Sequence, residues 1–210
     1  MKIVVLGATG SVGRLIVAEG LARGHHIAAF VRNPSKIKEQ SPNLKVMVGN
    51  VLDDASLSRA LEGQDAVAYS IGVRSPRATT LFSDSTRKLL GLMERQGVKR
   101  LVCITGVGAG ETRGHGGFLY DCIGYPLITK KIYLDKDRQE EIIRRSPLEW
   151  TIVRPTVFRE GRADSEFQVV TDVKGVVLRR ISRQEVANFV LDELETGRFI
   201  HQTPFIGHAH

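Results

Sequence analysis

The chain opens with Met1-Lys-Ile-Val-Val-Leu-Gly7-Ala-Thr-Gly10-Ser-Val-Gly13, in which three glycines at three-residue spacing follow an apolar segment. Gly7 permits a tight turn between a strand and a helix, Gly10 lets the backbone approach a pyrophosphate, and Gly13 allows close packing of the helix on the strand. The N-terminus of that helix offers N–H groups and a positive dipole end to an anion. The sequence therefore predicts a dinucleotide-binding turn made of Gly7, Ala8, Thr9, Gly10, Ser11, Val12 and Gly13.

Apolar runs alternate with helical patterns along the rest of the chain. Strands are predicted over residues 2–6, 26–31, 44–48, 66–70, 100–105 and 150–154. Helices are predicted over residues 11–23, 55–62, 79–96, 128–145 and 182–194. We expect Ser11 to cap the first helix, and Ser182 with Glu185 to form a capping box on the last. This βαβ rhythm predicts an α/β fold of the Rossmann type, a doubly wound and mostly parallel sheet with helices on both faces.

Length and composition favour one domain with a full apolar core. The chain has 210 residues, of which 42% are hydrophobic, and no linker or repeat divides it. We expect residues 1–210 to form a single NAD(P)-binding domain with a small substrate-side portion at the C-terminal end. No apolar run approaches the ~18 residues of a membrane span, and the chain enters a strand without a signal-like segment, so a cytoplasmic protein is expected. Cys103 and Cys122 have neither disulfide nor metal-ligand spacing, and no metal site is predicted.

The net charge of +7 allows two interpretations. Clustered lysines and arginines attract nucleic acid, but the basic residues are dispersed over 32–38, 130–145 and 179–183, and no recognised nucleic-acid module is present. The preferred interpretation is therefore binding of an anionic cofactor together with a solvated basic surface.

The end of the second predicted strand bears on the choice of cofactor. An acidic residue about 20 residues after the glycines usually binds the ribose of NAD, whereas an arginine accommodates the 2′-phosphate of NADP. This chain has no Asp or Glu between Gly20 and Lys38. The segment instead offers a guanidinium, an amide, a hydroxyl and an ammonium group, from Arg32, Asn33, Ser35 and Lys36. NADP(H) is predicted, with NAD(H) as the less favoured cofactor; the alternative role for Arg32 is a solvated charge at a strand end.

The carboxyl ends of the other strands are expected to line the same crevice. We predict that Asn50 and Val51 lie against the adenine, and that Ile71 and Gly72 lie beneath the ribose and pyrophosphate. The alternative is that these positions are ordinary strand ends. The complete set of strand-end residues predicted around the cofactor is Asn50, Val51, Ser70, Ile71, Gly72, Thr105 and Gly106.

The motifs resemble the atypical short-chain dehydrogenase/reductases, in the NmrA-like branch that includes biliverdin-IXβ reductase/flavin reductase. The resemblance covers nearly the whole chain and rests on residues 7–13, 31–33, 49–53, 150–156 and 181–187. It implies a Rossmann core, NAD(P)H binding and reduction of flavins, quinones or similar conjugated acceptors. It also implies that Pro155, Thr156 and Val157 pass near the nicotinamide.

The chain departs from the Tyr-x-x-x-Lys pair with which most short-chain dehydrogenases oxidise alcohols. Ile132 stands four residues before Lys136, and Tyr133 stands only three residues before it. Thr105 and Gly106 occupy the region where a serine is expected. Lys136 is the predicted catalytic residue, able to bind the nicotinamide ribose or to assist protonation, with Thr105 and Tyr133 as polar helpers. The alternative places Lys136 on a solvated, charged helix face.

Residues 106–118 contain six glycines and are predicted to form a lid over the nicotinamide. Phe118, Tyr120 and Tyr125 would stack on a flat acceptor, and Arg113 or His115 would meet an anionic substituent. A surface loop with aromatic residues packed on the core is the alternative.

The favoured function is an NAD(P)H-dependent reductase of a small conjugated acceptor. One rival is an NmrA-like redox sensor that binds the dinucleotide without turnover and signals to a protein partner. A second is a nucleotide-sugar epimerase or dehydratase, which the missing tyrosine-lysine pair and the short C-terminal half disfavour.

Overall fold

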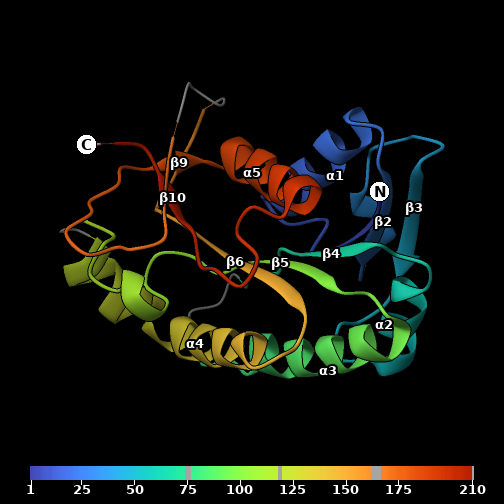
Figure 1. Ribbon diagram of the computed structural model, residues 1–210, viewed down its shortest axis with the longest axis horizontal. Helices are drawn as coiled ribbons and strands as arrows, with labels where there is room; N and C mark the ends of the chain where they lie inside the picture. Colours follow the sequence, from blue (N-terminus) through green and yellow to red (C-terminus); the bar gives the residue numbers. More distant parts are fainter. Residues whose placement is uncertain (74–76, 118–119, 162–166, 210) are drawn as a thin grey trace.

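The computed structural model describes residues 1–73, 77–117, 120–161 and 167–209. Within these residues the main sheet has eight strands in the order β3-β2-β1-β4-β5-β6-β10-β8 (Figure 1). The strands are β1 (Lys2–Leu6), β2 (His26–Val31), β3 (Leu44–Val48), β4 (Ala66–Tyr69), β5 (Arg100–Ile104), β6 (Glu149–Pro155), β8 (Gln168–Val170) and β10 (Phe205–Gly207). Neighbouring strands are parallel except β10 and β8. The predicted Rossmann-type fold is confirmed.

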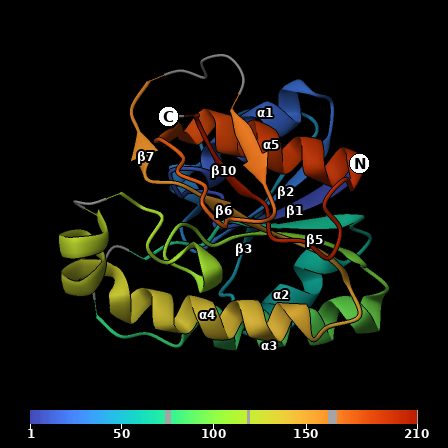
Figure 2. The same cartoon turned by 60° about the vertical axis from the view of Figure 1, so that its left-hand side comes forward.

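Helices cover both faces of this sheet. They are α1 (Gly13–Ala22), α2 (Asp54–Leu61), α3 (Leu81–Gln96), α4 (Lys130–Arg144) and α5 (Arg183–Thr196). Figures 1 and 2 show α1 and α5 over one face and α2, α3 and α4 over the other. None of the helices in the described residues combines the length and apolar character that crossing a bilayer requires.

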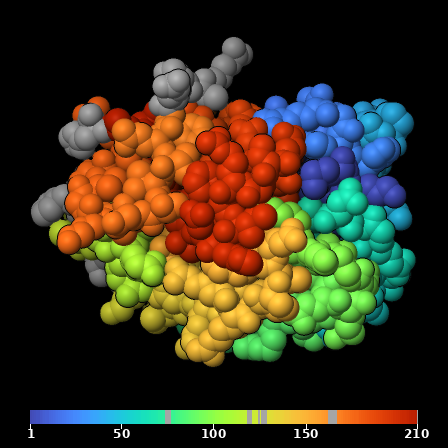
Figure 3. All heavy atoms as spheres, viewed as in Figure 1, coloured from blue at the N-terminus to red at the C-terminus, as the bar shows by residue number. Residues whose placement is uncertain are grey.

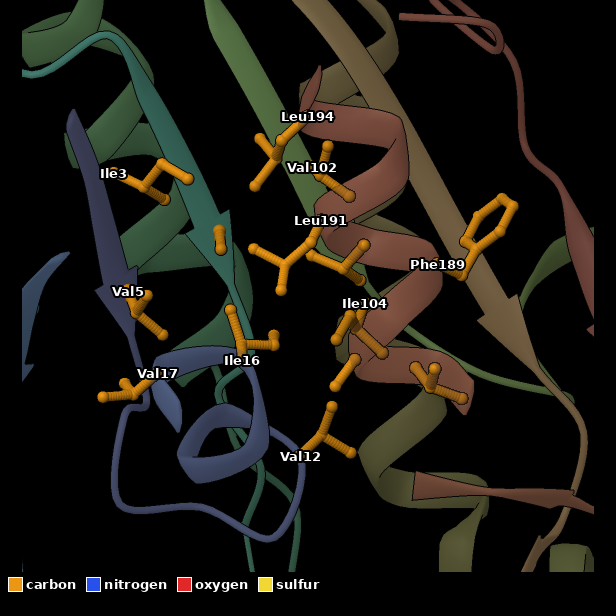
Figure 4. Close-up of a cluster of buried hydrophobic side chains, with 14 of the residues drawn as sticks. Ile3, Val5, Val12, Ile16, Val17, Val102, Ile104, Phe189, Leu191 and Leu194 are labelled. Carbon is orange, nitrogen blue, oxygen red and sulfur yellow. The ribbon is translucent and has the colours of Figure 1, made fainter. Parts of the chain in front are cut away.

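From Ile3 to Leu6, the side chains of β1 are apolar on both faces of the strand, and both faces are buried. Ile3 and Val5 point into the cluster beneath α1 and α5, where they meet residues such as Leu191 (Figure 4). Val4 and Leu6 belong to the second cluster, beneath α2 and α3. Successive side chains of a strand point to opposite faces, so a continuous apolar run is what a central parallel strand needs.

The order of the strands reverses beside β1. The chain moves outward through β2 to β3 and then returns with β4 on the other side of β1. Leu6 is level with Phe30 of β2 and with Tyr69 of β4, and the N–H of Ser70 donates to the carbonyl of Leu6 at 2.9 Å. In open α/β sheets, such a reversal leaves a crevice at the carboxyl ends of the strands.

The two predicted helix caps have different outcomes. The Ser11 cap is wrong, because α1 begins at Gly13 with Val12 as its N-cap and no side-chain cap bond. The capping box of α5 is confirmed. The N–H of Glu185 donates to Ser182 Oγ at 3.2 Å, and the N–H of Ser182 donates to Glu185 Oε2 at 2.7 Å.

The structure contains several short elements that were not predicted from the sequence. A π-helix (Tyr120–Thr129) leads into α4, and β7 (Phe158–Arg159) pairs with β9 (Ile181–Ser182). Figure 3 shows the segment after β6, in orange, beside the C-terminal segment, in red, on one face of the molecule. Sequence reasoning missed β7 to β10, because strands of two or three residues give too few alternations to register as a pattern.

Candidate functional site

The glycine-rich turn packs against the strand end across the point of reversal. Gly7 has a φ of +84°, and a Cβ on it would lie 2.5 Å from the carbonyl oxygen of Ser70. A Cβ on Gly13 would lie 2.2 Å from the carbonyl oxygen of Gly7, and one on Gly10 would lie 3.0 Å from the same atom. Gly7 and Gly13 therefore need to be glycine for the packing of the turn itself, besides any need of a ligand, whereas a Cβ on Gly10 would be tight.

The start of α1 exposes donor groups at this turn. The Gly10 N–H is bound to the Gly7 carbonyl at 2.8 Å, and the Arg14 N–H is bound to the Gly10 carbonyl at 3.1 Å. Among the described residues, the N–H groups of Ser11 and Val12 have no acceptor. Together with the helix dipole, these donors suit an anion.

The four residues predicted to bind the phosphate, Arg32, Asn33, Ser35 and Lys36, follow directly after β2. Asn33 caps a short 3-10 helix (Pro34–Lys36), accepting hydrogen bonds at its Oδ1 from the Ser35 N–H at 3.0 Å and from the Ser35 hydroxyl at 2.8 Å. This local role was not visible in the sequence. Arg32 and Lys36 are exposed, and neither forms an ion pair within the described part of the chain. The strand end therefore presents two uncompensated cations to solvent.

The residues after β3 and β4 differ in how far the fold already engages them. Asn50 is exposed, and its Oδ1 accepts from the N–H of Leu52 at 3.1 Å, which fixes a turn before α2. Val51 and Ile71 are half-buried against the cluster under α2 and α3. Gly72 is exposed, and a Cβ on it would meet nothing within 4 Å. Because the carbonyl of Ser70 packs against Gly7, these residues after β4 lie opposite the glycine-rich turn.

Lys136 is buried rather than solvated. Its side chain enters the fold from α4, and its Nζ donates to the carbonyl oxygens of Thr105 at 2.9 Å and Ile104 at 3.3 Å. The same atom lies 4.8 Å from the centroid of the Phe82 ring. Burial lowers the pKa of Lys136, and nearby Cys103 is the main opposing influence. The interpretation of Lys136 as part of a solvated face is therefore wrong.

Tyr133 reaches the same strand end. Gly106 has a φ of +133°, and a Cβ there would lie 2.6 Å from the hydroxyl oxygen of Tyr133. The Tyr133 ring lies 5.9 Å from that of Tyr125, between centroids. Tyr133 and Lys136 are three residues apart on α4 and therefore lie on the same side of the helix. Both side chains reach the peptide unit between Thr105 and Gly106.

The Thr105 hydroxyl is turned away from this meeting point. It donates to Glu140 Oε1 at 2.6 Å, and both residues are buried. The Thr105 N–H donates to the carbonyl of Val153 at 2.9 Å, which continues the pairing of β5 with β6. What Thr105 offers to the strand-end crevice is therefore its carbonyl group, which holds Lys136.

An ion-pair network around the buried Arg154 supports this region, and the sequence analysis missed it. Arg154, 1% exposed in β6, donates to Glu140 Oε2 at 2.5 Å and to Glu111 Oε2 at 2.6 Å. Burial alone would lower the pKa of Arg154, but its bonds to Glu140 and Glu111 raise it. A charged residue inside an otherwise apolar strand is the signal that could have revealed the network.

A second missed contact joins α4 to α3. Asp135 is fully buried, and its Oδ2 accepts from the N–H groups of Phe82 at 2.9 Å and Ser83 at 3.4 Å. Its Oδ1 accepts from the Ser83 hydroxyl at 2.5 Å. Asp135 thereby caps the second and third N–H groups of α3 from a different helix, since the N-cap residue Thr80 forms no side-chain cap bond, and it fixes the helix that carries Tyr133 and Lys136.

The segment predicted as a lid is partly tied to the fold. Arg113 donates to Asp137 at 2.5 Å, and His115 Nδ1 lies 2.8 Å from the carbonyl oxygen of Val176. These contacts occupy the two side chains expected to meet an anionic substituent. Tyr125 packs on Tyr133, whereas Phe118 lies outside the described residues, as does the side chain of Tyr120.

A cavity of about 600 Å³ opens where β6 ends, and Thr156 and Val157 form part of its wall. Pro155 accepts a hydrogen bond at its carbonyl from the Val107 N–H at 2.8 Å, so the ends of β5 and β6 stay together. The glycine-rich turn, the Lys136 contact and this cavity follow the carboxyl ends of β1, β5 and β6 in the parallel sheet.

Comparison with known proteins agrees with this arrangement. A model of the NAD(P)H-binding family matches residues 7–196. The chain belongs to this family. The match includes the glycine-rich turn, the strand ends and Lys136, and the resemblance to atypical short-chain dehydrogenase/reductases is confirmed.

Relatives of this NAD(P)H-binding protein include YwnB of Bacillus subtilis, which is 28% identical over 93% of this chain and 92% of its own length. The chloroplastic divinyl chlorophyllide a 8-vinyl-reductase of Cucumis sativus is 25% identical over 98% of this chain but only 52% of its own, so the chain spans about half of that relative. The anaerobillin reductase ChuY of Escherichia coli has the same fold, with a TM-score of 0.82, 16% identity and coverage of 99% of this chain and 97% of that one.

Proposed function

We propose that this NAD(P)H-binding protein is a reductase that prefers NADPH to NADH and reduces a small conjugated acceptor such as a flavin or a quinone. The observation that carries the proposal is the meeting of Lys136 and Tyr133 at the Thr105–Gly106 peptide. Lys136 and Tyr133 at the end of β5 can orient a nicotinamide and an acceptor. Their spacing differs from the Tyr-x-x-x-Lys pair with which most short-chain dehydrogenases oxidise alcohols. Conjugated acceptors need orientation and exclusion of water more than they need a strong base.

The residues present fit a dinucleotide. The turn from Gly7 to Gly13, namely Gly7, Ala8, Thr9, Gly10, Ser11, Val12 and Gly13, would hold the pyrophosphate through its free N–H groups. Arg32 and Lys36 would bind the 2′-phosphate, with Asn33 and Ser35 shaping the loop that carries them. The remaining contacts would come from Asn50, Val51, Ser70, Ile71, Gly72, Pro155, Thr156 and Val157. The bound cofactor would supply a hydride.

The chain's own groups would then position the reactants and manage one proton. The Lys136 ammonium has three N–H groups, of which two are donated to Ile104 and Thr105. The third would donate to a hydroxyl of the nicotinamide ribose. Tyr133 would hydrogen-bond the acceptor and pass it the proton that balances the incoming hydride.

The relatives support the class of reaction. The cucumber relative is named as a vinyl reductase, and reduction of a conjugated carbon framework with a nicotinamide cofactor is the chemistry proposed for this chain. Its identity of 25% supports a reductase in general and not the same substrate.

The test is oxidation of NADPH and NADH by the purified protein across a panel of flavins, quinones and dyes, beside equilibrium binding of both cofactors. We expect binding of NADPH and acceptor-dependent turnover with at least one flavin or quinone. Binding of NADPH without turnover of any acceptor would overturn the proposal in favour of a redox sensor.

A further inference from the structure

The cavity at the end of β6 has a strongly basic wall. Among the described residues, its lining contains three arginines and a histidine but neither Asp nor Glu. The basic residues of the wall are Arg159, Arg179, Arg180 and His208. Val157, Val177 and Leu178 add apolar surface beside the charges, which is the mixture that binds a flat ring carrying an anionic group.

The basic wall is fixed to the end of β6 by hydrogen bonds. The Thr156 hydroxyl donates to the carbonyl of Arg179 at 2.9 Å. The Arg179 N–H donates to the carbonyl of His208 at 2.7 Å, and the His208 N–H returns a bond of 3.2 Å to the carbonyl of Arg179. The segment that carries the arginines is therefore held beside Thr156 and Val157, the residues proposed to pass near the nicotinamide.

The carboxylate of Glu185 contacts two of the basic residues of the wall. Glu185 Oε1 lies 3.5 Å from Arg159 Nη2 and 2.9 Å from His208 Nε2. Arg180 is exposed, and no hydrogen bond or ion pair joins its side chain to another described residue. An exposed arginine that lines a partly apolar cavity can thus meet an incoming anion without first breaking an internal contact.

We propose that this cavity is the acceptor site and that it selects acceptors with an anionic substituent, a phosphate or a carboxylate, through Arg180. The inference rests on the proposed reductase function and adds the class of substrate. Arg113 and His115, the residues the sequence suggested for this role, are bound to Asp137 and Val176 instead.

The experiment compares pairs of planar acceptors that differ in one charged group. FMN and riboflavin share a ring system and differ in a phosphate, whereas anthraquinone-2-carboxylate and 2-(hydroxymethyl)anthraquinone test a carboxylate. Dissociation constants are measured by fluorescence titration for the wild type, Arg180→Gln and the control Arg59→Gln on the exposed face of α2. Because binding is measured without turnover, the result does not depend on whether the protein oxidises NADPH.

We expect the wild type to bind the anionic member of at least one pair more tightly. Arg180→Gln should weaken that binding by about threefold or more and leave the neutral partner unchanged. Arg59→Gln should behave as the wild type. Preference in only one pair identifies phosphate or carboxylate as the group recognised. Equal binding within both pairs, or equal weakening of charged and neutral members by Arg180→Gln, overturns the proposal. Charge discrimination without NADPH oxidation would support this site while overturning the reductase function.

Discussion

The Nζ atom of Lys136 donates a 2.9 Å hydrogen bond to the carbonyl oxygen of Thr105, so a buried cation of α4 is joined to the carboxyl end of β5. The hydroxyl of Thr105 is bound in the opposite direction, to Glu140. The carboxyl end of β5 and helix α4 are therefore joined through two oxygen atoms of Thr105, its carbonyl oxygen and its hydroxyl. The third N–H of Lys136 is the one proposed to contact the cofactor.

Replacement of Lys136 by methionine tests this role. Methionine fills a similar volume without a donor, so we expect kcat/KM with NADPH to fall by at least about tenfold, the cost of a hydrogen bond from a charged group. Lys130→Met removes a lysine from an exposed position of the same helix and should leave kcat/KM unchanged. Steady-state kinetics with both variants decides the matter; equal activity in Lys136→Met and wild type would assign the residue a purely structural role.

Arg32 should determine the choice between the two nicotinamide cofactors. Arg32→Ala removes an exposed guanidinium proposed to bind the 2′-phosphate, which NADH lacks. We expect the dissociation constant for NADPH to rise by about tenfold and that for NADH to change little. Titration of both cofactors against wild type and the surface control Arg59→Ala provides the measurement. Equal weakening of the two cofactors would show that Arg32 does not recognise the phosphate.

The effects of replacing Arg154 and Glu140 on the free energy of unfolding should not be additive, because the two side chains form a buried ion pair. Arg154→Met leaves the Glu140 carboxylate, 4% exposed, without its principal cation. We expect a loss of about 3–5 kcal/mol in the free energy of unfolding, measured with urea. Because Glu140→Gln removes the stranded charge but still accepts from Thr105, the double variant should lose less than Arg154→Met alone. Additive losses would argue against an interacting pair.

Glu111 should make stability depend on acid pH. Partial burial would raise its pKa, but hydrogen bonds from Arg154, its own backbone and Arg144 lower it from 4.5 to about 2. A lowered pKa stabilises the fold above pH 4.5, and the contribution is lost as the pH falls toward 2. The difference in unfolding free energy between wild type and Glu111→Gln should therefore shrink between these values. A difference independent of pH would contradict the ion pair.

Gly13 and Gly91 should respond in opposite directions to alanine. A Cβ on Gly13 would lie 2.2 Å from the carbonyl oxygen of Gly7, so Gly13→Ala should destabilise the protein by about 1–3 kcal/mol. Gly91 lies within α3, where a Cβ would meet only the end of the Arg95 side chain at 3.5 Å. Gly91→Ala should thus be neutral or stabilising by up to about 1 kcal/mol. Denaturant unfolding measures both; a harmless Gly13→Ala would show that the turn can relax.

The sequence allowed the sheet, its helices and the phosphate-ready turn to be predicted because their signals are local. Apolar runs mark β1 to β6, and the glycine spacing marks the turn after β1. The partners of the charged residues on α4 could not be predicted in this way. Asp135 and Glu140 stand among many charged residues of α4, yet they bind α3 and β6 through contacts between residues far apart in the chain. Only the packed fold shows which charges are buried.

The same limit applies to the acceptor side of the site. Arg113 and His115 follow a glycine-rich segment and looked suited to an anion, but both are engaged within the fold. Arg179 and Arg180 come to the cavity through a bridge with His208, close to the C-terminal end of the chain. The pairing that places them depends on strands too short to leave a pattern in the sequence.

The central claim is that the protein transfers hydride from NADPH to an acceptor and does not merely hold the cofactor. Rapid mixing of the NADPH-bound protein with FMN or a quinone, in a single turnover, tests it most directly. We predict that bound NADPH is oxidised and that deuterium at the transferred position of the nicotinamide slows the oxidation. Persistence of bound NADPH with every acceptor, in a protein that binds it tightly, would contradict the reductase account and leave a redox sensor in its place.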